Sequence, residues 1–162
     1  MRTLIVYFSR FGNTRRLAET MAETMKSAGQ ARVASIDQLA ASDVQGVDLV
    51  VMGTPTHAFA VPAAVRKILQ SLPSGILNGK SVAAFDTTVK PWPLRHLRAA
   101  PKLLKRLIRL GGKPVARPET FFVATENPQK AGEVDLLLEG ELDRGRQWAG
   151  EVVDSSKTSA KN

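Results

Sequence analysis

Five short apolar segments alternate with helical patterns along the chain, and this alternation constrains the fold more than any other feature. The segments are rich in β-branched and aromatic residues and lie at 3–8, 31–36, 47–54, 80–87 and within 113–125. Such apolar runs are typical of strands buried on both faces. Strands that alternate with helices form a parallel sheet with helices on both sides. The sequence therefore predicts an α/β fold with a doubly wound five-stranded parallel sheet.

The helices between these segments are predicted from apolar side chains at helical spacing and from glycine or proline at the ends. The first ends near Gly29, the second lies between Pro62 and Pro73, and the last two cover about 101–110 and 139–153. No repeat or linker interrupts the pattern. We expect one domain, residues 1–154, followed by a polar tail, residues 155–162, that is disordered.

Composition excludes several classes of site. The chain has no cysteine and two histidines, which excludes disulfides and thiolate ligands and disfavours a metal site built from protein ligands. No apolar run is long enough to span a membrane, and the first residues lack the features of a signal peptide. A cytoplasmic protein is therefore the expectation.

The first strand runs directly into small and hydroxylated residues, and a helical pattern starts immediately behind them. The residues of this turn are Ser9, Arg10, Phe11, Gly12, Asn13 and Thr14. The free N–H groups and the dipole at the start of a helix attract anions, and a glycine permits a turn that a side chain would obstruct. Helix capping by Asn13 or Thr14 is the simpler alternative, but capping does not require the whole run. The turn therefore favours a phosphate-binding site.

The stretch "VYFSRFGNTRRLAE" resembles the phosphate-binding loop of flavodoxins, and the resemblance covers essentially the whole chain in the order and length of its elements. "DLVVMGTPTH" is similar to the strand and second flavin loop of that family, and "VAAFDTTV" is similar to the strand before its third loop. The resemblance implies a flavodoxin-like fold and non-covalently bound FMN, with the phosphate at Ser9 to Thr14. It also implies that two further loops flank the isoalloxazine ring. Their residues are Pro55, Thr56, His57, Ala58 and Phe59 in the second loop, and Asp86, Thr87, Thr88, Val89 and Lys90 in the third.

The roles of three ring-bearing side chains in these loops stay open. Phe59 and Trp92 either stack on the flavin or pack against the protein, and His57 either contacts the ring or is a rim residue. Flavodoxins resemble one another in a tyrosine that stacks on the flavin from the third loop, whereas the single tyrosine here, Tyr7, lies in the first strand. The sequence identifies no catalytic residue.

Charge is the second departure from the family, because flavodoxins that carry electrons resemble one another in an acidic surface. This chain has a formal net charge of +8, and no carboxylate occurs from Thr87 to Pro118. Within that segment, one face of the predicted helix carries Arg98, Lys102, Lys105 and Arg109. The stripe is either a solvated helix face or a surface for an acidic partner.

Two function classes follow. The favoured one is an FMN-binding redox protein, either an electron carrier or a small flavin-dependent reductase, for example of quinones. Its partner would be a redox protein with an acidic surface or a small-molecule acceptor. The alternative is a non-redox binding protein on the same scaffold, which uses the basic helix to dock an acidic partner or polyanion; a nucleic acid is the less favoured partner. Whether the protein is an enzyme is undecided, because a fold does not determine a function.

Overall fold

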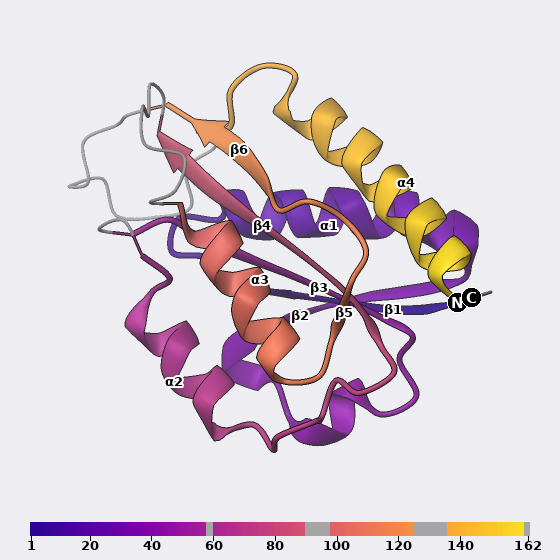
Figure 1. The fold of residues 1–162 in the computed structure, drawn as a ribbon. Coiled ribbons are helices and arrows are strands. Elements are labelled where there is room, and N and C mark those ends of the chain that lie inside the picture. Colours follow the sequence, from indigo (N-terminus) through magenta and orange to yellow (C-terminus); the bar gives the residue numbers. More distant parts are fainter. Residues whose placement is uncertain (58–59, 90–97, 125–135, 161–162) are drawn as a thin grey trace.

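Six parallel strands form one sheet in the part of the chain that the computed structural model describes, residues 1–57, 60–89, 98–124 and 136–160 (Figure 1). The strands are β1 (Arg2–Tyr7), β2 (Gln30–Ser35), β3 (Leu49–Pro55), β4 (Ser81–Val89), β5 (Lys113–Pro114) and β6 (Glu119–Val123). Their order across the sheet is β2-β1-β3-β4-β5, and β6 also pairs with β4. The chain therefore winds outward from β1 in one direction and then in the other.

The fifth position of the sheet is filled by two short strands in succession. β5 pairs with Ser81 and Val82 at the start of β4, whereas β6 pairs with Phe85–Val89 at its end. Pro114 and Pro118 lie at and between these strands, and proline has no N–H with which to continue a ladder. The expected five-stranded doubly wound sheet is confirmed, with an interruption in its last strand.

Four α-helices within the described residues cover the two faces of the sheet. They are α1 (Asn13–Met25), α2 (Ala63–Ser71), α3 (Ala99–Arg109) and α4 (Glu141–Ser159), and three short 3-10 helices lie at Lys26–Ala28, Ile36–Gln38 and Ala41–Val44. α1 and α4 pack on one face, and α2 and α3 pack on the other (Figure 1). None of the helices in the described ranges is both long and apolar enough to cross a membrane.

The apolar runs of the strands serve both faces at once. In β1, Leu4 and Val6 pack with the helices of the α2–α3 layer, and Ile5 packs with those of the α1–α4 layer. Phe85 of β4 is fully buried between the sheet and the α1–α4 layer. Its ring meets those of Phe121 and Trp148 edge-on, at centroid distances of 5.9 and 6.0 Å. Burial on two sides explains why these segments show no alternation of polar and apolar residues.

The last helix is longer than the sequence predicts. α4 continues to Ser159, so residues 155–159 are helical where a disordered tail was expected. The reason is its buried stripe, because Ala149, Val152, Val153 and Ser156 recur at helical spacing and all four are buried. Ser156 continues this buried stripe although it is polar. A prediction from apolar residues alone therefore ends the helix too early.

Candidate functional site

The three predicted loops follow β1, β3 and β4, whose carboxyl ends lie side by side at one edge of the sheet (Figure 1). The strand order reverses between β1 and β3, since the chain leaves β1 for β2 and then returns to β3 on the other side. Ligands of open α/β sheets bind in the crevice at such a reversal. We refer to this place as the carboxyl edge.

The turn after β1 presents the start of α1 at the carboxyl edge. Gly12 is the N-cap residue, with a φ of 88° in the left-handed region, and no side chain caps the helix. The first intrahelical bond runs from the Arg16 amide to the Gly12 carbonyl, at 2.9 Å. The N–H groups of the first turn therefore have neither an intrahelical acceptor nor a capping side chain, which is the arrangement that binds an anion.

Two side chains predicted to hold the phosphate make contacts within the protein. The Thr14 hydroxyl lies 3.0 Å from the Thr87 hydroxyl of β4, and both side chains are buried. The Asn13 side-chain oxygen accepts a hydrogen bond from the Leu136 amide at 2.9 Å. The turn is thus fixed from two sides, which leaves its backbone to face a ligand.

The other residues of this turn are more accessible. Ser9 and Phe11 are half-buried, and Arg10 is exposed with its guanidinium 5.4 Å from the centre of the Phe11 ring. Arg10 therefore adds a positive charge beside the start of α1. Contact of these residues with a phosphate stays a prediction.

The second loop is a tight turn at the end of β3. The Thr56 amide donates to the Thr87 carbonyl at 2.8 Å, and His57 and Ala60 exchange two backbone hydrogen bonds of 3.1 and 3.0 Å. His57 is exposed, and Pro55 and Thr56 are half-buried. Ala58 and Phe59 lie outside the described residues.

The third group of predicted residues belongs largely to a strand. β4 continues through Asp86, Thr87 and Thr88 to Val89, because β6 pairs with it along this stretch. The sequence placed the end of the strand at Thr87, two residues too early. Lys90 and Trp92 lie outside the described residues.

Thr56 and Asp86 hold the start of α3. Asp86 Oδ2 accepts hydrogen bonds from the Ala100 amide at 2.8 Å and from the Thr56 hydroxyl at 2.9 Å, and the same hydroxyl accepts one from the Ala99 amide at 2.9 Å. The two residues therefore cap a helix that lies more than ten residues further along the chain. Their described contacts go to α3, and their contact with a flavin ring stays a prediction.

Asp86 is a fully buried carboxylate, and its Oδ1 atom has no hydrogen-bond partner among the described residues. Burial raises the pKa of Asp86 above its usual range, although the hydrogen bond from the Ala100 amide opposes this effect. The negative charge lies at the N-terminus of α3, where the helix dipole stabilises it. Sequence reasoning missed this capping role. One indication of it is present in the sequence, because Arg98 occupies the position before α3 where a capping Ser, Thr, Asp or Asn is usual.

The comparison with known families now decides the identity. Residues 5–148 match the family model described as "Flavodoxin". The chain belongs to the flavodoxin family. FMN is the cofactor of this family, as the sequence resemblance implied.

Individual flavodoxins are distant from this chain. The flavodoxin of Aquifex aeolicus (strain VF5) is 27% identical over 92 residues, which are 54% of this chain and 50% of that protein. The match therefore covers about half the length of this curated relative.

Solved structures share the fold at low identity. Flavodoxin 1 from Bacillus cereus superposes with a TM-score of 0.72 at 19% identity, covering 95% of this chain and 98% of that one. The rubredoxin oxygen:oxidoreductase from Desulfovibrio gigas gives a TM-score of 0.75 at 18% identity, covering 97% of this chain and 36% of that one. The flavodoxin fold is thus present both in proteins of this size and as part of a larger chain.

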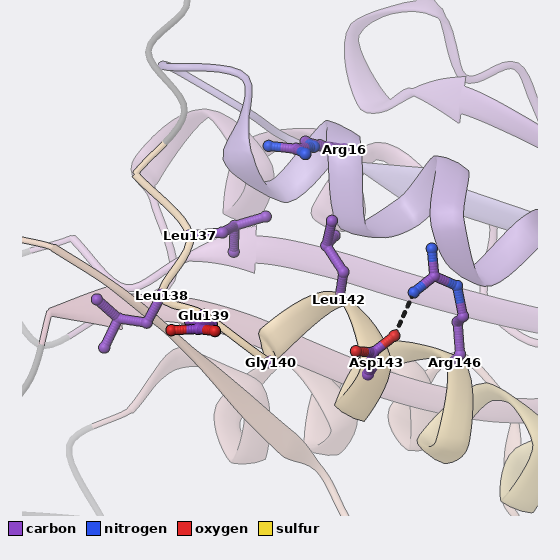
Figure 2. Close-up of a pocket in the computed structure, with 8 residues that line it drawn as sticks. All are labelled: Arg16, Leu137, Leu138, Glu139, Gly140, Leu142, Asp143 and Arg146. Atoms are coloured by element: carbon purple, nitrogen blue, oxygen red, sulfur yellow. Dashed lines mark hydrogen bonds and ion pairs between the residues drawn. The ribbon is translucent and has the colours of Figure 1, made fainter.

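A separate cavity lies between the start of α1 and the start of α4 (Figure 2). Its volume is about 280 Å³, and it is lined by Arg16, Leu137, Leu138, Glu139, Gly140, Leu142, Asp143 and Arg146. Two of its charges pair with each other, since Asp143 lies 2.5 Å from Arg146. None of the predicted flavin-binding residues lines this cavity, although Arg16 belongs to the first turn of α1 and follows the predicted phosphate turn by two residues.

Proposed function

We propose that this chain binds FMN non-covalently at the carboxyl edge and serves in electron transfer. The observation that carries the proposal is the start of α1, where Gly12 adopts a left-handed φ of 88° and no side chain caps the helix. An FMN phosphate at residues 9–14 would accept hydrogen bonds from the free backbone N–H groups in the first turn of α1. The helix dipole and Arg10 would add positive charge there. When bound, FMN supplies the redox chemistry, and the protein positions it.

An electron carrier is the role that the described residues support best. Among the residues described in the three loops, the titratable side chains are Arg10, His57 and Asp86. Asp86 is buried and bonded to α3, and a guanidinium group is a hydrogen-bond donor without an acceptor site, so His57 is the remaining candidate for proton transfer. Carrying electrons requires no protein acid or base, whereas reducing a quinone takes up protons. Quinone reduction is the second role, and steady-state assays with a water-soluble quinone test it.

Calorimetric titration of the apoprotein with FMN and with riboflavin, which lacks the phosphate, tests the proposal. Each hydrogen bond to a charged group contributes about 1.5–3 kcal/mol, so two backbone N–H groups on the phosphate correspond to an affinity difference of roughly 100-fold or more. We expect FMN to bind more tightly than riboflavin by at least this factor. Equal affinities would contradict the phosphate site, and no binding of either flavin would favour the non-redox alternative.

A pair of glycine variants locates the phosphate. Gly12 and Gly79 both have left-handed φ angles, 88° and 74°, but Gly79 precedes the start of β4 and an added Cβ there would meet no atom within 4 Å. Gly12→Ala and Gly79→Ala therefore introduce the same kind of backbone strain at opposite edges of the sheet. We expect only Gly12→Ala to weaken FMN binding, and a similar loss in both variants would mean that strain alone explains the effect.

A further inference from the structure

Charge is divided unevenly along the chain and between the two layers of helices. From Leu49 to Pro118 the sequence contains twelve of the 23 lysines and arginines but a single carboxylate, Asp86. That carboxylate is fully buried and does not reach the surface. This segment contains α2 and α3, whereas α1 and α4 belong to the remainder, in which carboxylates outnumber lysines and arginines. The charged residues of α2 and α3 are therefore all lysines and arginines.

The outer side of α3 concentrates this charge. Lys102, Lys105 and Arg109 recur at three- and four-residue spacing opposite the buried Leu103 and Leu107, so they follow one side of the helix. Arg98 continues this spacing just before the helix, but it is half-buried, with its guanidinium 5.5 Å from the centre of the Phe122 ring. Lys105 and Arg109 are exposed, and Ile108 between them is 43% exposed. Ile108 is the large hydrophobic residue that stands exposed within the described ranges. We call Arg98, Lys102, Lys105, Ile108 and Arg109 the basic face of α3.

The basic face begins at the candidate FMN site. The first two amides of α3 are bound by Thr56, which directly follows β3, and by Asp86, which lies three residues before the end of β4. Arg98 is therefore held at the carboxyl edge. The 11 residues of α3 span about 16 Å at 1.5 Å per residue, so Arg109 lies at the far end of the face. A protein that covers this face would extend to the carboxyl edge as well.

We propose that the basic face of α3 docks an electron-transfer protein that presents an acidic surface; this inference rests on the function proposed above. Complementary charge accelerates encounter between such partners, and an exposed apolar side chain amid charges matches the apolar centre and polar rim of protein interfaces. A duplex nucleic acid would use the charge but not the exposed Ile108, and this one side chain supplies little of the apolar area on which binding to an anionic membrane depends. An acidic protein is therefore the partner that uses all of the described features.

The test uses two electron acceptors with the same haem and opposite charge. Native cytochrome c is cationic, whereas succinylation of its lysines makes it anionic. The FMN-loaded protein is reduced with dithionite, the excess reductant is removed, and mixing with either acceptor is followed by stopped-flow absorbance. Each transferred electron converts one ferric haem iron to ferrous. We expect succinylated cytochrome c to be reduced at least about 10-fold faster at low salt, with the difference shrinking as salt screens the charges.

Two double variants change the net charge of the protein by the same amount at different places. They show whether the acceptor preference depends on the position of the charges or only on the total charge. Lys105→Glu/Arg109→Glu reverses two charges on the basic face, and Lys26→Glu/Lys157→Glu reverses two exposed charges outside the α2–α3 layer. We expect the first variant to lose the preference for succinylated cytochrome c and the second to keep most of it. Equal loss in both variants, or no preference in the parent protein, would overturn the inference.

Two further readouts distinguish the remaining explanations. Bound FMN is measured independently by its visible absorbance, and its absence in the parent protein would refute the proposed function and this inference with it. Binding to phosphatidylserine-containing vesicles or to duplex DNA is measured by co-sedimentation and by fluorescence anisotropy. If Lys105→Glu/Arg109→Glu abolished such binding but left the acceptor preference unchanged, the face would serve a polyanion and the inference would be wrong.

Discussion

Replacement of Thr56 with valine tests how the carboxyl edge is held together. Valine keeps the shape of threonine but removes the hydroxyl, which accepts from the Ala99 amide and donates to Asp86, each at 2.9 Å. An amide left without a partner costs about 1–3 kcal/mol, and a lost hydrogen bond to a carboxylate costs about 1.5–3 kcal/mol. Because Thr56 is half-buried and water can reach part of the site, we expect a loss of about 2–3 kcal/mol of unfolding free energy.

Urea unfolding of the apoprotein, followed by far-UV circular dichroism, measures this loss. Thr158→Val is the matched control, since its hydroxyl donates to the Asp154 carbonyl at 3.0 Å on an exposed part of α4. The control should change the unfolding free energy by less than about 0.5 kcal/mol. Thr56→Val should also cost more above the pKa of Asp86 than below it, because the removed donor favours the ionised carboxylate. Equal, small effects of the two substitutions would refute the capping role.

Two further predictions concern buried positions. The pKa of Asp86 is raised above its usual 3.8, so the unfolding free energy should fall as the pH rises from below 3.8 through the native pKa. Asp86→Asn should remove that fall. If the pH profile of this variant matched that of the parent protein, the raised pKa of Asp86 would not be its cause. A Cβ on Gly53 would lie 2.1 Å from the fully buried ring of Phe85, whereas one on Gly150 would meet nothing within 4 Å. Gly53→Ala should therefore destabilise the protein by about 1–3 kcal/mol or more, and Gly150→Ala should stabilise it by about 0.5–1 kcal/mol, as thermal unfolding would show; the opposite order would contradict the packing.

The sheet could be predicted because its strands are continuous runs of apolar residues. Leu4, Ile5 and Val6 are buried on alternating faces, and only a strand between two layers of helices requires an unbroken apolar run. The start of α1 was also predictable, since Gly12 and the hydroxylated residues around it are consecutive in the sequence. Both features depend on neighbours along the chain.

The contacts between distant segments could not be predicted in the same way. Thr56, Asp86 and α3 meet only because β3 and β4 are adjacent in register, with Pro55 opposite Thr87. The extra turns of α4 depend on Ser156, which is buried although it is polar. Such contacts arise from tertiary packing. Arg98 before α3 indicates that a capping side chain is missing locally, but residue type and spacing do not identify Thr56 and Asp86 as its replacement.

The central claim is that the backbone at the start of α1 holds the phosphate of FMN. Amide chemical shifts of the ¹⁵N-labelled apoprotein test it most directly, because hydrogen bonds from an N–H group to a charged acceptor move its proton signal downfield. We expect the amides of Asn13 and Thr14 to shift strongly with FMN and little with riboflavin. Equal shifts with the two ligands, or no shift of these amides with FMN, would contradict the account.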